Sequence, residues 1–268
     1  MLGKVMKYEF KAIGRILPLF YIALIAASVF LAINLRFIPA DTFFGMLIRT
    51  ISGSLYGIIL AATAIVTLVI LISRYKKSML GDSGYYMLTL PVKMETHILA
   101  KTFSATIWGF FSLVVSIITI MIIGTMTYIG DIRAVFYQMM EAFKSLTSNE
   151  KALGAILILE FLILVILSLT KTALTIYAAM SFGQLSKNHP NLMAVVFYMG
   201  FNFIESMIAT IILNILDKVI FINQIFDKLI KDLKGLDIFM LILIILSTLI
   251  CVVYFVITNL YMKKKLDI

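Results

Sequence analysis

Residues 74–101 read RYKKSMLGDSGYYMLTLPVKMETHILAK and separate two long hydrophobic runs. The segment begins with three basic residues and continues with Gly81, a short apolar stretch and Pro91. A proline such as Pro91 ends a helix because its ring fixes φ and removes the backbone N–H donor. The pattern predicts a loop with a basic start and one short helix, on which a partner could dock.

The composition on either side of this loop indicates a membrane protein. Of the 268 residues, 62% are hydrophobic and 14% are charged, whereas a soluble domain has about 45–50% apolar and about 25% charged residues. A water-soluble core cannot bury that excess, so lipid must contact much of the surface. The net charge of +9 is explained by basic residues that flank membrane spans, and no nucleic-acid partner is expected.

Six hydrophobic runs reach the length of about 20 residues that a spanning helix needs. They cover residues 16–35, 51–73, 102–124, 155–180, 192–213 and 238–261. An even number of spans places both termini on one side of the membrane. The segments on that side contain thirteen Lys and Arg residues, and the segments on the other side contain nine. The positive-inside rule therefore predicts cytoplasmic termini. The expected fold is an all-α polytopic membrane protein forming one transmembrane domain over residues 1–268.

Amphipathic helices are expected outside the spans. In residues 1–15 the lysines fall on one helical face and Met6, Phe10 and Ile13 fall on the other, which is typical of a helix at the lipid–water interface. The outside segments 125–154 and 214–237, after the third and fifth spans, repeat the pattern. They either cover the ends of spans or form a lid over a pathway.

The second span contains a row of small residues, Gly53, Gly57 and Ala61, at every fourth position. Such rows allow two helices to approach closely. The sequence predicts tight packing at this row, most simply within the chain.

Two charged residues lie deep within predicted spans, where charge is costly and usually paired or functional. Lys171 lies about 18 Å and Glu205 about 20 Å from the cytoplasmic ends of their spans at a rise of about 1.5 Å per residue. The matching depths predict that both face the protein interior and can pair. The pair either fixes helix register or serves substrate passage or proton coupling. Glu160 is expected near the outer boundary, in contact with solvent.

Motifs of soluble enzymes are missing from the sequence. The two histidines, His97 and His189, fall in predicted cytoplasmic loops without a second histidine at ligand spacing, so neither a metal site nor a catalytic site is expected and both should be surface residues. Cys251 is the only cysteine, which excludes an internal disulfide. No G-x-x-x-x-G-K-S/T motif occurs, so any ATP must be bound by another chain.

The loop and its surroundings resemble a known family of membrane proteins. The stretch GDSGYYMLTLPV at residues 81–92, with Lys101 ahead of the third span, is similar to the first loop of ABC-2-type transporter permeases of low-GC Gram-positive bacteria. The basic N-terminal helix, the six spans and the outside helices resemble the same family. Ser83 departs from it, because a glutamate is common at this position.

The resemblance implies a membrane subunit of an ATP-driven exporter in the bacterial cell membrane. In that family the first cytoplasmic loop carries a coupling helix that docks on a separate, dimeric ATPase subunit, which binds ATP and Mg. A second permease copy or a sister permease completes the transporter, and the cargo is an amphipathic or antimicrobial peptide or a similar amphiphile. The residues expected to dock on the ATPase are Asp82, Ser83, Tyr85, Tyr86, Leu88 and Leu90.

Two other functions fit the same features. An ion-coupled secondary transporter would use Lys171 and Glu205 and would show inverted repeats and broken spans, although no clear repeat is visible. A membrane scaffold or sensor subunit would need neither an ion-coupling pair nor inverted repeats. Co-purification with an ATPase distinguishes the exporter from both.

Overall fold

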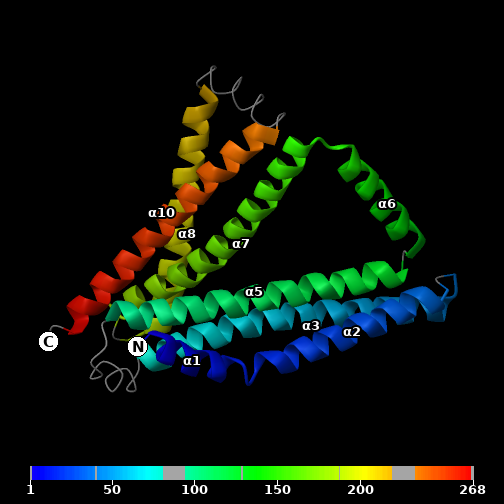
Figure 1. Ribbon diagram of the computed structural model, residues 1–268. Helices are drawn as coiled ribbons and strands as arrows, with labels where there is room; N and C mark the ends of the chain where they lie inside the picture. The colour runs from blue at the N-terminus through cyan, green and yellow to red at the C-terminus, as the bar shows by residue number, and fades with distance from the viewer. Residues whose placement is uncertain are drawn as a thin grey trace. The chain divides into compact units, whose positions relative to one another are not determined.

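Every regular element is helical in the part of the chain that the computed structural model describes, which is residues 2–39, 41–80, 94–127, 129–186, 188–218 and 233–266 (Figure 1). The helices are, in order, α1 (Leu2–Ile13), α2 (Leu17–Phe37), α3 (Phe43–Tyr75), the π turn η1 (Lys76–Leu80), α5 (Met94–Thr127), α6 (Ile129–Ser145), α7 (Ser148–Gly183), α8 (Pro190–Lys218) and α10 (Leu233–Leu266). The all-helical prediction is confirmed for these residues.

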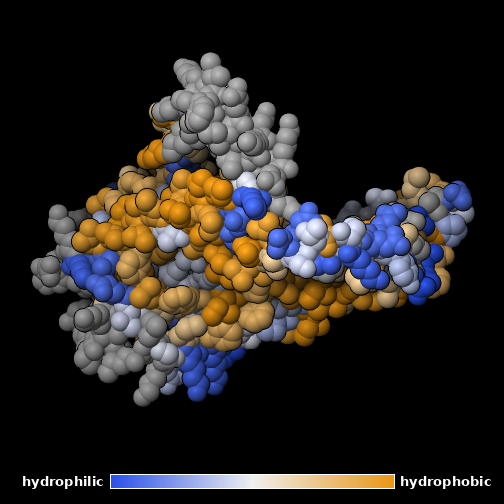
Figure 2. Space-filling model, turned by 45° about the horizontal axis from the view of Figure 1, so that its top comes forward, coloured by the Kyte–Doolittle hydropathy of each residue, from blue (hydrophilic) through white to orange (hydrophobic). Residues whose placement is uncertain are grey.

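Six helices are long and apolar enough to cross a membrane: α2, α3 with η1, α5, α7, α8 and α10. Large apolar side chains such as Leu19, Phe203 and Ile245 are more than 60% exposed. Figure 2 shows apolar residues covering most of the described helices on the face that it presents. Because water would not tolerate so large an apolar surface, the chain is a membrane protein with multiple spans, as the sequence predicts.

The ends of several helices differ from the predicted spans. Helix α5 begins at Met94 rather than residue 102, and helix α7 begins at Ser148 rather than residue 155. A capping box explains the start of α7, because Thr147 accepts a hydrogen bond from the Glu150 N–H and the Glu150 carboxylate accepts one from the Thr147 N–H. Polar residues therefore lie within the first turns of these helices.

The two outside segments are described to different extents. Helix α6 fills most of the first one and exposes Val135, Phe136 and Tyr137. In the second one α8 continues to Lys218 and α10 begins at Leu233, while residues 219–232, which hold most of the predicted amphipathic helix, lie outside the described residues.

The described helices divide into two compact units, which are treated separately below. Apart from the first two residues, unit 1 consists of Gly3–Ser73 and Ile107–Ser145, and unit 2 consists of Arg74–Thr106 and Leu146–Ile268. The boundaries between the units fall inside α3 and α5.

Hydroxyl groups join the spans of unit 1. The Tyr21 hydroxyl of α2 lies 2.7 Å from the Ser112 hydroxyl of α5, which is also 3.1 Å from the Thr67 hydroxyl of α3. Ring packing extends this contact, because Phe10 of α1 lies 4.7 Å from the Trp108 ring. The apolar side of α1 thus packs on α5, with Ile13 buried.

Arg49 of α3 binds the carbonyl oxygens at the C-terminal end of α2 in unit 1. Its guanidinium group donates hydrogen bonds to the Leu35 and Ile38 carbonyl oxygens, each at 2.9 Å from one of its nitrogens. The last carbonyl groups of a helix have no partner within the helix and carry partial negative charge. Arg49 therefore stabilises the end of α2 and is not simply a loop residue.

The prediction of tight packing at Gly53 and Gly57 is wrong for the described part of the chain. A Cβ atom built at either residue would have no atom within 4 Å. The contacts of α3 instead use other positions, such as Tyr56, whose hydroxyl lies 3.0 Å from the Thr119 hydroxyl. Spacing alone could not show which side of α3 would be covered.

Unit 2 is built from α7, α8 and α10, with α7 packed against both of the others. Aromatic rings fill the space between them, and Phe182 of α7 contacts Phe201 of α8 and Tyr261 of α10. At the end of α7 the backbone of α8 approaches so closely that a Cβ on Gly183 would lie 2.6 Å from the Pro190 carbonyl oxygen and 2.7 Å from the Ala194 Cβ. Glycine is needed here because any side chain would separate the helices.

Candidate functional site

The predicted docking residues Asp82, Ser83, Tyr85, Tyr86, Leu88 and Leu90 lie outside the described residues. The structure describes both ends of the predicted 74–101 loop. Residues 74–80 belong to α3 and η1, and residues 94–101 belong to α5. Both ends are part of unit 2.

The end that precedes the loop is anchored to α7 and α8. The Tyr75 side chain is fully buried, its ring stacks on Tyr177 with centroids 4.1 Å apart, and its hydroxyl lies 2.9 Å from the Ser181 hydroxyl. One residue later, the Lys76 ammonium donates to the Asn191 side-chain oxygen at 2.8 Å. These contacts hold the start of η1 against the ends of α7 and α8 that face each other at Gly183.

The end that follows the loop is anchored to α10. The Glu95 carboxylate accepts hydrogen bonds from the Lys263 ammonium at 2.8 Å and from the Asn259 amide at 3.3 Å. His97 and Lys101 are buried on α5, 1% and 3% exposed. The expectation that His97 is a surface loop residue is therefore wrong, because α5 starts earlier than its polar sequence indicates. His189, by contrast, is exposed.

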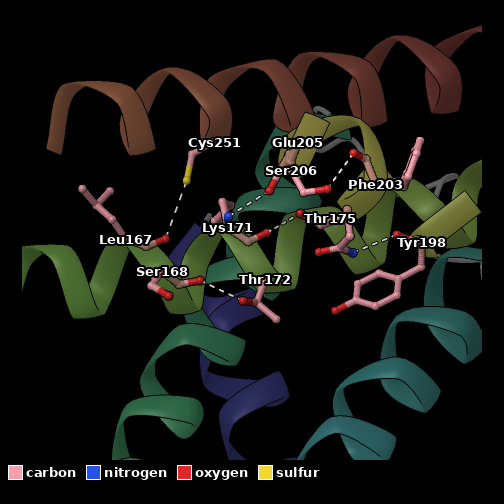
Figure 3. A network of polar contacts seen from close by, with 11 residues as sticks. Leu167, Ser168, Lys171, Thr172, Thr175, Tyr198, Phe203, Glu205, Ser206 and Cys251 are labelled. Carbon is pink, nitrogen blue, oxygen red and sulfur yellow. Dashed lines mark hydrogen bonds and ion pairs between the residues drawn. The ribbon is translucent and has the colours of Figure 1, made fainter. Parts of the chain in front are cut away.

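Lys171 and Glu205 lie in contact between α7 and α8. The Lys171 ammonium is 2.9 Å from a Glu205 carboxylate oxygen (Figure 3). The side chain of Lys171 is 33% exposed and that of Glu205 is 21% exposed. Each residue lies more than ten residues from either end of its helix, so each charge compensates the other at a depth where lipid cannot solvate it.

Helix α10 supplies neighbours of this pair that were not predicted from the sequence. The Tyr254 side chain faces the Glu205 carboxylate and the Thr175 hydroxyl, and the Cys251 thiol faces the Leu167 carbonyl oxygen at 3.8 Å. The second carboxylate oxygen of Glu205, Oε1, is buried and accepts no hydrogen bond from the described residues. Local spacing could not identify these neighbours, because they come from a helix that lies far away in the sequence.

The expectation that Glu160 contacts solvent is wrong. Its side chain is 4% exposed and faces the carboxyl group of Asp237 on α10. The contact of α7 with α10 covers this position. Glu160 therefore lies against another helix of unit 2, and one of its carboxylate oxygens, Oε2, is buried without a hydrogen bond from the described residues.

The geometry favours binding or conformational coupling. Among the described residues, no group of three or more His, Cys, Asp and Glu side chains could hold a metal ion. The site joins three spans by one ion pair and several hydroxyl groups, and the same three spans hold both ends of the predicted loop. No protein-family model, curated protein or solved structure matches the chain. The fold and the site define a membrane protein with multiple spans and a polar contact between α7 and α8.

Proposed function

We propose that this chain is the membrane subunit of an ATP-driven exporter in a bacterial cell membrane. A separate ATPase subunit binds ATP and Mg and docks on the loop that contains Asp82 to Leu90. This chain has no nucleotide-binding motif of its own and is not itself an enzyme. The proposed cargo is an amphipathic or antimicrobial peptide or a similar amphiphile.

The observation that carries the proposal is the anchoring of both ends of the loop in one unit. Tyr75 and Lys76 connect the first end to α7 and α8, and Glu95 connects the second end to α10. A force applied to residues 81–93 would therefore reach α7, α8 and α10 together. An ATPase that moves the loop would in this way change the packing around Lys171 and Glu205.

The remaining parts of the proposal rest on the sequence. Basic residues favour cytoplasmic termini, which would put the loop on the side where ATP is found. Helix α1 and the outside segments would lie at the two membrane surfaces. A second permease copy, or a sister permease, would match the two subunits of a dimeric ATPase.

Replacement of the docking residues tests this function. The chain would be expressed with the ATPase encoded nearest to it, and the complex would be purified through a tag on the chain. We expect the double substitution Tyr85→Ala and Leu88→Ala to abolish co-purification and stimulated ATP hydrolysis, because aromatic and apolar anchors dominate interfaces. The matched control Tyr137→Ala with Met140→Ala removes an exposed tyrosine and an exposed methionine from α6 and should retain the complex. Unchanged co-purification of the docking variant would show that the site is elsewhere.

The ion pair favours a second candidate function, an ion-coupled secondary transporter. A partly exposed Lys171–Glu205 pair within the spans could exchange protons or ions with a pathway. This function predicts transport driven by an ion gradient in vesicles that contain only this chain. The exporter predicts no transport until the ATPase and ATP are added.

A further inference from the structure

Polar side chains also lie on the outside of the contact between α7 and α8. Ser168, Asn202 and Ser206 are exposed and Thr172 is half-exposed. We call these four residues the polar face. They form two i, i+4 pairs, so each pair makes a stripe along one side of its helix. Figure 3 shows Ser168 and Thr172 on the side of α7 away from α10.

The polar face lies in the middle of the spans. Each of its residues is at least about 15 Å along the axis from either end of its helix, at a rise of about 1.5 Å per residue. All four residues also lie inside the candidate membrane spans Ser148–Gly183 and Pro190–Ile211. The stripes also run beside the Lys171–Glu205 pair, which is itself partly exposed.

Three side chains of the polar face donate hydrogen bonds within their own helices. The Thr172 hydroxyl donates to the Ser168 carbonyl oxygen and the Ser206 hydroxyl to the Phe203 carbonyl oxygen, both at 2.9 Å. One amide hydrogen of Asn202 is donated to the Tyr198 carbonyl oxygen at 2.8 Å. Each bond uses one donor and leaves lone pairs on the side-chain oxygen that can accept a further hydrogen bond.

Lipid tails cannot satisfy such a surface. Serine and threonine hydroxyls that bond to their own helix are tolerated in lipid, so they would not be informative alone. The exposed amide of Asn202 does require hydrogen-bond partners, because hydrocarbon supplies none. The Lys171 ammonium is also partly exposed and can only donate, whereas the unpaired Glu205 oxygen is buried. Water, which donates and accepts, meets both requirements, and a ligand that is rich in donors meets that of the Asn202 oxygen.

We propose that the polar face borders water within the membrane and binds hydrogen-bond donors, such as the ammonium group of an amphiphile. The presence of water follows from the side chains whether or not the chain is an exporter. The amphiphile as transported cargo rests on the proposed function. Bound there, its ammonium group would contact the oxygens of the polar face while its hydrocarbon chain lies along the neighbouring apolar side chains.

Thiol labelling tests whether the face is hydrated. In a Cys251→Ser background, Thr172→Cys and Ser206→Cys place thiols on the polar face. Ile166→Cys and Met207→Cys are the matched controls, because these side chains are exposed, apolar and close in sequence. A charged, membrane-impermeant methanethiosulfonate is added to open membrane fragments, so that it reaches both sides. We expect at least tenfold faster labelling on the polar face.

Two outcomes would overturn the hydration. One is labelling at equal rates on the polar face and at the controls, which indicates lipid. The other is absent labelling with efficient disulfide cross-linking between two copies, which indicates a covering protein. A membrane-permeant maleimide and a single elution peak verify that each variant is folded, and Ser168→Cys replaces any variant that is not.

Two surfactants that differ only in their head groups test the donor preference. Dodecylammonium carries three N–H donors, whereas dodecyltrimethylammonium has the same charge and chain but no donor. Below the micellar concentration, we expect only dodecylammonium to slow the labelling of Ser206→Cys, by several-fold. Equal protection by both, or by neither, would contradict the binding of donors. Neither experiment contains the ATPase, so a failure of the exporter proposal would leave these results standing.

Discussion

The two units use different chemistry to hold their spans together. In unit 1 the named side-chain contacts between spans join neutral hydroxyls, as in Tyr21 with Ser112 and Tyr56 with Thr119, and the charged Arg49 binds only carbonyl oxygens at the end of α2. The sequence has no charged residue in 16–35, 50–73 or 107–127, which form most of these spans. In unit 2 the ion pair of Lys171 and Glu205 joins α7 and α8.

The difference bears on the proposed function. Hydroxyl contacts stabilise helix packing in a membrane, and losing one partner costs little free energy because each hydroxyl can also bond to its own helix. An ion pair is costly unless both partners are present, and replacing it with apolar residues is often neutral or stabilising. A chain that needed only stability could use hydroxyls in both units. The charges in unit 2 are therefore compatible with the role in coupling that the proposed function gives them, as well as with a role in fixing helix register.

Breaking the ion pair should have the largest effect. We expect Lys171→Met or Glu205→Leu to lower the free energy of unfolding by about 2–4 kcal/mol, because each leaves an unpaired charge, although partial exposure reduces the effect below that of a fully buried pair. The double variant should recover most of the loss. Equilibrium unfolding in mixed micelles would measure all three. Strictly additive losses would show that the two side chains act independently.

Filling the close contact at Gly183 should have the next largest effect. Gly183→Ala places a methyl group against the Pro190 carbonyl oxygen and Ala194, and we expect a loss of about 1–3 kcal/mol from overpacking. Gly200→Ala is the matched control in the same unit, because a Cβ there meets no atom within 4 Å. It should raise stability by about 0.5–1 kcal/mol through helix propensity. If Gly183→Ala left the free energy of unfolding unchanged, α7 and α8 would separate easily.

Replacing one tyrosine in each unit by phenylalanine allows the hydroxyl contacts of the two units to be compared directly. We expect Tyr75→Phe to cost about 1 kcal/mol, since the lost hydrogen bond to Ser181 is buried. Tyr21→Phe in unit 1 should cost about half as much, as is typical of such bonds in membranes, because Ser112 keeps its contact with Thr67. Tyr8→Phe, at a residue that is 76% exposed, is the control. Unfolding in the same mixed micelles provides the comparison, and the reverse order would show that the first end of the loop is only loosely held.

The contact at the other end of the loop should have the smallest effect. Glu95 and Lys263 are 42% and 51% exposed, and exposed ion pairs contribute little because water and salt screen them. We expect Glu95→Gln to change stability by less than about 0.5 kcal/mol. The effect of Glu95→Gln on stimulated ATP hydrolysis should exceed its effect on stability if this contact transmits motion. A large destabilisation would instead assign the contact a purely structural role.

The sequence predicts the number of spans well and their ends less well. Long apolar runs identify a spanning helix because lipid requires both the length and the apolar surface. The ends depend on polar residues, and a polar residue can lie inside a helix. The sequence places His97 and Lys101 in the loop for this reason, yet both are buried on α5. The capping box of Thr147 and Glu150 could have been recognised, since its S/T-x-x-E spacing is visible in the sequence.

The site was predictable only in part. Lys171 and Glu205 stand out because ionisable residues are rare within spans, and their matching depths indicate that contact is feasible. Tyr254, Cys251 and Asp237 carry no such signal, because tyrosine and cysteine are ordinary in apolar helices and Asp237 lies near the start of α10. Their proximity to α7 depends on how the helices pack, which spacing along one helix does not determine.

The π turn Lys76–Leu80 bears on how the chain should be aligned with any relative. A π turn closes with one residue more than an α turn, so it can lose one residue and still leave its last residue at the same angle around the axis of α3. A one-residue gap within 76–80 would therefore keep the orientation of Leu80. The same gap inside 43–75 would rotate everything that follows by about 100°. A difference of one residue at this place would therefore not by itself change the direction in which the chain leaves α3.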